Sequence, residues 1–313
     1  MEIPVYVFTG LLDSGKTTFL QEVCKEPDFL EAGTTILIQC EEGETAYEEG
    51  FLNKHNIFKI DLENKEDLNQ LLWKRCERLF APAQILIEYN GMWEMEALFQ
   101  SEMPQDWYLG GIYSTVDATT AELYLTNMRK TFVEPLRYSN LIMFNRCPED
   151  FDRLKFRRNL KALNPQVDIA FERPDGTLFQ NDMETLPFDY TQSVISLEDM
   201  DYGLWYLDAM EHPERYEKKE ISFTARFCAS AKPGQHYFIP GRHIMTCCED
   251  DIQFLGYVCY YEGELPYQHG DWIRVRVLFD YRYCSIYGEE GPVFLLRDIH
   301  PSQPPAQELV TFS

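Results

Sequence analysis

The sequence is poor in basic residues. Its 28 lysines and arginines face 52 aspartates and glutamates, which gives a formal net charge of −24. A chain this acidic repels the phosphate backbone of DNA and RNA. We therefore expect no nucleic-acid partner.

Long apolar runs and cysteine pairs are also missing. No apolar stretch approaches the ~20 residues that cross a membrane, and the first residues lead into a strand pattern without the basic segment of a secretory signal. The nine cysteines are odd in number and scattered except for Cys247 and Cys248. This pattern is typical of reduced thiols, and we expect a cytoplasmic protein.

What is present is a core large enough for two domains, because 45% of the 313 residues are apolar. Residues 1–175 alternate β-branched apolar runs with amphipathic segments. Strands are predicted at residues 3–8, 34–39, 84–88, 111–117, 141–145 and 167–171, and helices at 64–79 and 149–162. This alternation predicts an α/β domain with a mostly parallel sheet, whose ligands bind at the carboxyl ends of the strands.

The pattern changes after residue 175. Residues 176–212 are interpreted as a connector with a helix over 197–211, and residues 213–313 as a smaller, mainly-β domain. Its predicted strands lie at 220–227, 254–261, 271–279 and 293–299, and several alternate apolar and polar residues as half-exposed antiparallel strands do. We expect a barrel or a sandwich, with the strand near residues 270–277 favouring an OB-like barrel.

Residues 10–17 carry the motif with the clearest chemical meaning, G-L-L-D-S-G-K-T, directly after the apolar run at 3–8. A glycine loop between a strand and a helix wraps a polyphosphate with its backbone N–H groups. The phosphate site is predicted to include Gly10, Asp13, Ser14, Gly15, Lys16, Thr17 and Thr18. Lys16 would reach the phosphates as a catalytic group, and the Thr17 hydroxyl would hold Mg²⁺.

Two further strand ends supply partners for this loop. Glu88 ends the strand at 84–88 and precedes a turn at Gly91. Its carboxylate is a candidate for ordering Mg²⁺ or the attacking water, although it could equally be a solvated strand end. Asn145 and Arg146 end the strand at 141–145. They are candidates for binding the edge and the face of a purine base.

Six motifs in one order resemble the CobW/HypB/UreG family of P-loop GTPases, and within it the CobW-like branch. They are T-G-L-L-D-S-G-K-T-T at 9–18, Q-C-E-E-G-E at 39–44, I-E-Y-N-G at 87–91, V-D-A at 116–118, N-R-C-P at 145–148 and L-N-P at 163–165. The resemblance implies GTP as ligand with Mg²⁺, slow hydrolysis by a P-loop phosphohydrolase, and a switch that serves metal insertion or trafficking. It also implies assembly that is often dimeric.

The chain departs from the family's pattern at three places. Pro148 replaces the aspartate that reads guanine, so ATP or relaxed use of nucleotides is the alternative to GTP. The family's Cys-x-Cys-Cys metal motif is absent after residues 39–44, where only Cys40 is near. Asp13 puts a carboxylate inside the phosphate loop, and we expect it to point away from the phosphates.

Residues 211–300 resemble a β-rich domain found at the C-terminus of one subunit of certain two-component bacterial permeases. The matching stretches include P-E-R-Y-E at 213–217 and G-R-H-I-M-T-C-C-E-D-D at 241–251. Cys247 and Cys248 could bind Zn²⁺ or another transition metal together with His243, or one of them could simply pack in the core.

Two functions remain open at this stage. The first is a nucleotide-driven switch whose β-rich domain docks a metalloprotein client or a membrane transport component. The second is a scaffold or adaptor with a degenerate nucleotide pocket and no significant hydrolysis, which Pro148 and Asp13 favour. The intact Lys16 and Thr17 favour the first.

Overall fold

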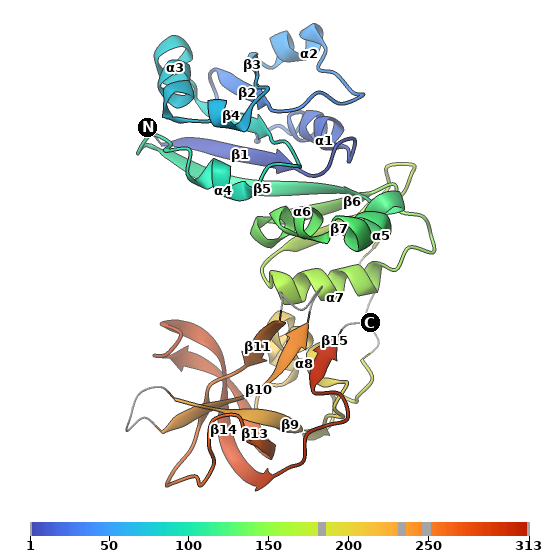
Figure 1. Ribbon diagram of the computed structural model, residues 1–313, viewed down its shortest axis with the longest axis vertical. Helices are drawn as coiled ribbons and strands as arrows, with labels where there is room; N and C mark the ends of the chain where they lie inside the picture. Colours follow the sequence, from blue (N-terminus) through green and yellow to red (C-terminus); the bar gives the residue numbers. More distant parts are fainter. Residues whose placement is uncertain (1, 181–185, 231–235, 246–251, 312–313) are drawn as a thin grey trace. The chain divides into compact units, whose positions relative to one another are not determined.

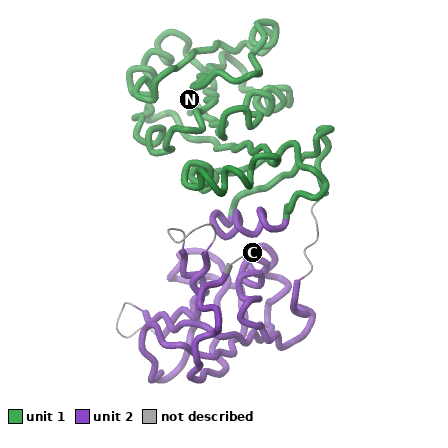
Figure 2. The backbone as a smooth tube through the Cα atoms, turned by 45° about the vertical axis from the view of Figure 1, so that its right-hand side comes forward, with its two compact units in different colours: residues 1–153, 166–182 green, residues 154–165, 183–313 purple. Residues whose placement is uncertain are grey.

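The computed structural model describes residues 2–180, 186–230, 236–245 and 252–311. The chain divides into two compact units (Figure 2). The first unit comprises residues 1–153 and 166–182, and the second comprises residues 154–165 and 183–313. The chain therefore leaves the first unit after residue 153, contributes a helix to the second, returns at residue 166 and leaves again after residue 182.

The first unit contains a seven-stranded sheet in which every pairing is parallel (Figure 1). In spatial order the strands are β3 (Ile57–Asp61), β2 (Thr35–Gln39), β4 (Gln84–Glu88), β1 (Ile3–Thr9), β5 (Trp107–Asp117), β6 (Leu141–Asn145) and β7 (Asp168–Phe171). Strands β2 and β4 are buried at every residue, as their continuous apolar sequences predict.

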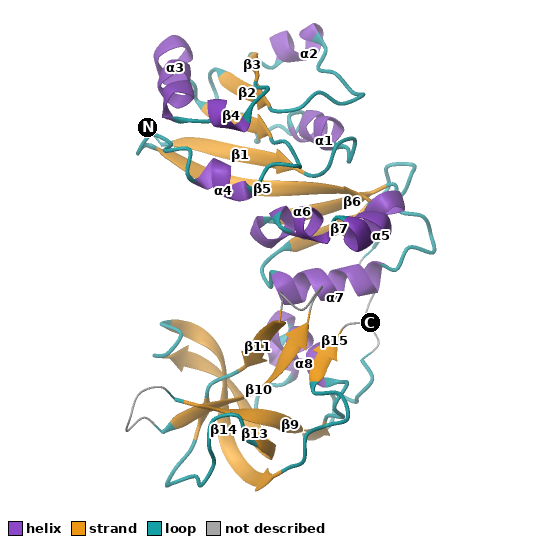
Figure 3. Cartoon of the chain, viewed as in Figure 1, coloured by secondary structure: helices purple, strands orange, loops and turns teal. Residues whose placement is uncertain are grey.

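Helices surround this sheet (Figure 3). They are α1 (Lys16–Val23), α2 (Glu49–Lys54), α3 (Gln70–Phe80), α4 (Met95–Phe99), α5 (Ala118–Asn127) and α6 (Arg129–Val133), with 3₁₀ turns at Lys65–Asp67 and Pro135–Tyr138. Alternate residues of β2 point to opposite faces of the sheet. Ile36 and Ile38 join a core with Trp73 of α3, whereas Leu37 joins a second core with Leu20 of α1.

Strand register sets the positions of the polar residues at the carboxyl edge of the sheet. Phe8 of β1 lies opposite Glu88, and Asp117 of β5 lies opposite Asn145. Because parallel strands end at the same edge, both pairs are brought to the place where the glycine loop leaves β1.

The second unit is mainly β and is built on a closed cycle of five strands. The cycle runs β9 (Glu220–Ala229), β10 (Tyr237–Met245), β12 (Cys259–Tyr260), β14 (Glu289–Pro301), β13 (Trp272–Cys284) and back to β9. The pairing of β12 with β14 is parallel and the other four are antiparallel. This is the strand order of an OB-type barrel, as the sequence indicated. Strands β8 (Val194–Ser196), β11 (Ile252–Gly256) and β15 (Leu309–Thr311) extend it at the edges.

An aromatic core fills this unit. Helix α8 (Tyr202–Glu211) places Trp205 against both Phe223 and Phe294, with ring centroids 5.5 and 6.0 Å away. Helix α7 (Arg153–Leu163) contributes Ala162 to the same core. A 3₁₀ turn at Pro213–Arg215 follows α8.

The predicted fold class is confirmed: a parallel α/β domain is followed by a barrel. Several elements differ from the prediction. The strand predicted at 254–261 is divided into β11 and β12, and β10 was not predicted. Strand β3 was not predicted. It lies at the edge of the sheet and alternates apolar and polar residues, unlike the continuous apolar runs by which the other strands of this unit were predicted. The helix predicted from residue 64 begins only at Gln70, because the Asn69 side chain accepts a hydrogen bond from Leu71 N at 2.9 Å and caps it there.

None of the helices in the described parts of the chain combines the length and the apolar character that crossing a membrane requires.

Candidate nucleotide-binding site

The glycine loop has the backbone shape that its glycines allow. Gly10 and Gly15 have φ values of 137° and 96°, which side chains rarely adopt. A Cβ atom on Gly10 would lie 2.3 Å from the carbonyl oxygen of Thr115, and one on Gly15 would lie 2.5 Å from Nδ2 of Asn145. Beside the loop, a Cβ atom on Gly91 would lie 2.1 Å from the Gly10 carbonyl oxygen. These three glycines let the loop lie tightly against its neighbouring strands.

Lys16 starts helix α1 and is buried, with 4% of its surface exposed. Its Nζ donates hydrogen bonds to the carbonyl oxygens of Gly10 at 2.8 Å and Leu11 at 3.0 Å. It also forms a salt bridge with the Glu41 carboxylate. The ammonium group is thus held over the loop, with an acidic side chain as its charged partner.

Thr17 and Glu88 meet directly. The Thr17 hydroxyl donates to Glu88 Oε1 at 2.9 Å, and the Tyr47 hydroxyl donates to the other carboxylate oxygen, Oε2. All three side chains are buried. Burial raises the pKa of Glu88 above its ordinary value, although the hydrogen bonds from Tyr47 and Thr17 and the charge of Lys16 oppose this shift.

The acidic segment, residues 40–48, lies over the phosphate loop. Besides Glu41 and Tyr47, it supplies the backbone N–H of Glu44, which donates to Asp13 Oδ1 at 3.1 Å. The Asp13 carboxylate is thereby turned toward this segment, with its own backbone in the left-handed region at φ 59°. A cavity of only about 60 Å³ remains here, and its lining includes Thr18 and Thr45.

Asn145 and Arg146 hold the other side of the loop. Asn145 Nδ2 donates to the Ser14 carbonyl oxygen at 2.7 Å, and Ser14 Oγ lies 2.8 Å from Thr115 Oγ1. Arg146 Nη1 donates to the Asp13 carbonyl oxygen at 3.1 Å and to Asp117 Oδ2 at 2.5 Å. The guanidinium is therefore turned toward the phosphate loop.

Asp117 has two roles in this arrangement. It caps helix α5 by accepting a hydrogen bond from Thr119 N at 2.9 Å, and it pairs with Arg146. Burial works to raise the pKa of Asp117, but the hydrogen bonds from Thr119 and the Arg146 charge outweigh it and hold the pKa below its ordinary value. Asp117 therefore caps the helix and contacts Arg146 at the same time.

The turn after Asn145 contains Pro148 where the family's sequence pattern has an acidic residue. The nearest acidic side chain in sequence, Glu149, is exposed and forms a salt bridge with Arg173 at 2.9 Å. Its carboxylate is thus already engaged by a cation from the segment after β7.

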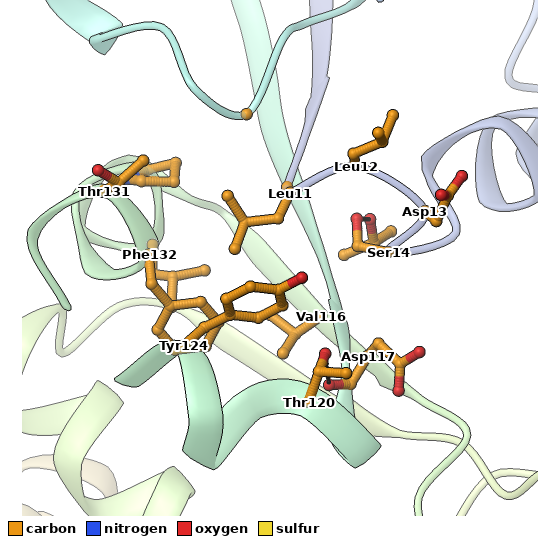
Figure 4. Close-up of a pocket in the computed structure, with 15 residues that line it drawn as sticks. Leu11, Leu12, Asp13, Ser14, Val116, Asp117, Thr120, Tyr124, Thr131 and Phe132 are labelled. Carbon is orange, nitrogen blue, oxygen red and sulfur yellow. Dashed lines mark hydrogen bonds between the residues drawn. The ribbon is translucent and has the colours of Figure 1, made fainter. Parts of the chain in front are cut away.

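A second cavity, of about 170 Å³, lies on the other side of the glycine loop. Figure 4 shows Leu11 pointing toward Tyr124 and Phe132, which form its apolar wall. Gly91 and Thr120 also line it.

Cys247 and Cys248, the cysteines of the predicted transition-metal site, lie outside the described residues. His243 is exposed on β10, where its ring packs against Phe254. Cys259 and Cys284 are buried, and the Cys284 sulfur lies 3.4 Å from the Tyr260 hydroxyl. Across the described ranges, no three His, Cys, Asp or Glu side chains come together as a metal site.

Sequence reasoning missed the contacts made by the acidic segment. It left Glu41, Glu42 and Glu44 open between a solvated acidic loop and a switch-like role near the γ-phosphate or a metal, and it did not mark Tyr47 at all. A loop residue three positions after Q-C-E-E-G-E carries no signal of its own, because its position depends on how the loop folds.

The parallel sheet, the glycine loop and the polar strand ends define a P-loop nucleotide-binding protein. The family model of the CobW/HypB/UreG nucleotide-binding domain matches residues 4–171, more than half of the chain. The chain therefore belongs to the CobW/HypB/UreG family. Residues 175–310 match the model of the DUF1980 C-terminal domain, which agrees with the distinct second domain expected from the sequence.

Solved structures of limited similarity include the zinc-bound YjiA GTPase from E. coli, at 17% identity and a TM-score of 0.43, with 74% of each chain covered. HypB from Archaeoglobus fulgidus has 13% identity and a TM-score of 0.39, covering 56% of this chain and 82% of its own. HypB from Helicobacter pylori in complex with nickel has 12% identity and a TM-score of 0.37, covering 55% and 80%. No curated protein sequence matches the chain. Function must therefore be inferred from the family and from this chain's own residues.

Proposed function

We propose that this protein binds a nucleoside triphosphate with Mg²⁺ and hydrolyses it slowly, acting as a molecular switch. The observation that carries the proposal is the meeting of Lys16, Thr17 and Glu88 at the end of the glycine loop. A buried ammonium, a hydroxyl and a carboxylate are there next to one another, and each suits a different part of a metal–triphosphate complex.

The residues present fit such a ligand. The loop backbone at Gly10 and Gly15 has the conformations of an anion-binding turn. Thr17 and Glu88 offer the hard oxygen atoms that Mg²⁺ prefers. When bound, the ion would neutralise charge on the phosphates, while Lys16 would hold them and Glu88 would orient the metal or its water.

The base is either guanine, as is typical of the family, or adenine. Asn145 stands at a strand end beside the loop and can serve either purine edge. Pro148 offers no carboxylate to read guanine, and Glu149 is paired with Arg173. We therefore propose purine binding with weak discrimination between GTP and ATP.

The family's link to metal handling suggests the purpose of the switch. We propose that the barrel docks a metalloprotein client or a membrane transport component and that nucleotide turnover times this contact. The cysteines at positions 24, 40, 76, 147, 228, 259 and 284 are free thiols, which supports a reducing compartment such as the cytoplasm. A homodimer is part of the proposal on family grounds alone.

A non-hydrolysing adaptor is the second candidate. The ion pair between Lys16 and Glu41 favours it, because the carboxylate already neutralises the cation that phosphates need. The small cavity beneath the acidic segment favours it too, since little space is left between this segment and the glycine loop.

Two measurements distinguish the hydrolysing switch from the adaptor. One is thermal unfolding with GTP, ATP and GDP, each with and without Mg²⁺, and the other is a phosphate-release assay. We expect stabilisation by the triphosphates with Mg²⁺ and slow release of phosphate. Lys16→Ala should abolish the stabilisation by triphosphates and the phosphate release. Lys25→Ala, which changes an exposed lysine shortly after helix α1, should leave both unchanged. Stabilisation without phosphate release would identify the adaptor, and no stabilisation by any nucleotide would refute nucleotide binding.

A further inference from the structure

Tyr47 is a buried residue of the acidic segment. The proposed nucleotide site gives it no role so far. Its ring belongs to the apolar cluster that includes Leu20, Ile57 and Leu86, and it stacks on Phe51 at 6.4 Å. The ring is therefore anchored between helix α1 and the sheet. A buried tyrosine hydroxyl needs a hydrogen-bond partner, and this one points at the Glu88 carboxylate.

The two oxygens of Glu88 are served by different hydroxyls. Thr17 donates to Oε1 and Tyr47 donates to Oε2. These donors differ in how they are held. A Thr17 hydroxyl that coordinates Mg²⁺ presents a lone pair to the ion and keeps its hydrogen for Glu88. The Tyr47 hydroxyl is carried by a ring that is anchored in the apolar cluster, so its position does not depend on a metal.

The burial of Glu88 makes this second donor important. Only 2% of its surface is exposed, so its oxygens depend on donors from the protein. Tyr47 supplies one such donor, and the nearby cation Lys16 is itself engaged by Glu41.

We propose that Tyr47 is a positioning residue for Glu88 and fixes the carboxylate toward the metal position. The role rests on the proposed function, because it concerns the metal that accompanies the nucleotide. This role also links the acidic segment to the metal position. If residues 40–48 moved and took Tyr47 with them, the Glu88 carboxylate would lose a hydrogen bond that fixes its orientation.

Tyr47→Phe tests this role, because it removes the hydroxyl and keeps the anchored ring. Tyr89→Phe is the matched control, since Tyr89 is also buried, adjoins Glu88 in sequence and donates instead to the Glu94 carbonyl oxygen at 2.8 Å. Binding of a fluorescent GTP or ATP analogue is titrated with Mg²⁺ and repeated in EDTA. We expect the half-saturating Mg²⁺ concentration to rise about tenfold in Tyr47→Phe alone, with nucleotide affinity in EDTA unchanged.

A double-mutant cycle removes the remaining ambiguity. If Tyr47 acts through Glu88, Tyr47→Phe adds nothing to the effect of Glu88→Gln. An unchanged Mg²⁺ requirement in Tyr47→Phe, or the same tenfold effect in the Glu88→Gln background, overturns the positioning role while the proposed function stands. A wild-type chain that binds no nucleotide with Mg²⁺ overturns both. Unfolding midpoints without ligand show that each variant is folded.

Discussion

The two units bury different kinds of side chain. In the described part of the first unit, twelve polar or charged residues are buried, and Ser14, Lys16, Thr17, Glu88 and Thr115 among them adjoin the glycine loop. The described part of the second unit buries three, which are Thr224, Arg242 and Asp280. Its interior is instead a cluster of tyrosine, tryptophan and phenylalanine rings.

The difference in buried residues indicates that the first unit holds the chemical site and that the interior of the second unit serves packing. Buried polar groups cost free energy unless they are hydrogen-bonded, so a dense cluster of them indicates a site retained for its chemistry. The barrel's buried charge is used structurally: Arg242 donates to the Gln307 carbonyl oxygen at 2.8 Å and holds the segment before β15. Substitutions in the two units should therefore have separable effects on stability and on ligand binding.

The largest effect should come from Trp205→Ala. It removes the ring that packs against Phe223 and Phe294 and should lower the free energy of unfolding of the barrel by about 3–5 kcal/mol. Denaturant unfolding followed by circular dichroism measures this loss. Nucleotide-induced stabilisation of the first unit should persist, and its disappearance would show that the two units do not behave separately.

Gly10→Ala should damage the loop by about 1–3 kcal/mol and abolish nucleotide binding, because its Cβ would meet the Thr115 carbonyl oxygen. Gly176→Ala is the control: it also has positive φ, at 84°, but nothing lies within 4 Å of the added atom. It should cost roughly 1–2 kcal/mol and leave binding intact. Calorimetric titration and thermal unfolding report the two quantities. Equal losses of binding in both variants would contradict the assignment of the loop.

Glu41→Gln should tighten triphosphate binding by about fivefold, or roughly 1 kcal/mol, because it frees Lys16 and removes a negative charge next to the phosphates. Glu42→Gln changes an exposed neighbour and should have little effect. Fluorescence titration compares the dissociation constants. Weaker binding in Glu41→Gln would instead show that Glu41 supports the bound ligand.

The smallest effect should come from Asp117→Asn, at about 0.5 kcal/mol near neutral pH. Asparagine keeps the helix cap but loses the ion pair with Arg146, whose side chain is 49% exposed. The pKa of Asp117 is lowered in the folded state, so its stabilisation is present above the ordinary pKa of aspartate and is lost as the pH falls through the lowered value. Unfolding measured from neutral to acidic pH should show the two proteins converging, and a constant difference would exclude the ion pair as its source.

Sequence predicted most of the fold and the outline of the site, because both depend on local patterns. Buried parallel strands are continuous apolar runs, and the glycine loop has a fixed spacing. The contacts of Lys16 with Glu41 and of Glu88 with Tyr47 could not be predicted, since they depend on the path of an irregular loop. The ion pair between Glu149 and Arg173 could not be predicted either. It joins two irregular segments, and no sequence pattern indicates that they are in contact.

The route of the chain through helix α7 limits how the protein can be divided. Residues 154–165 belong to the second unit, yet they are followed by β7 of the first. A fragment ending near residue 175 would keep the whole parallel sheet but carry a helix whose Ala162 and Lys161 have lost their partners in the barrel core and at Glu211. Such a truncated protein would expose an apolar surface that the second unit normally covers. Poor solubility of this fragment would therefore result from the loss of the second unit and not from a defect in nucleotide binding.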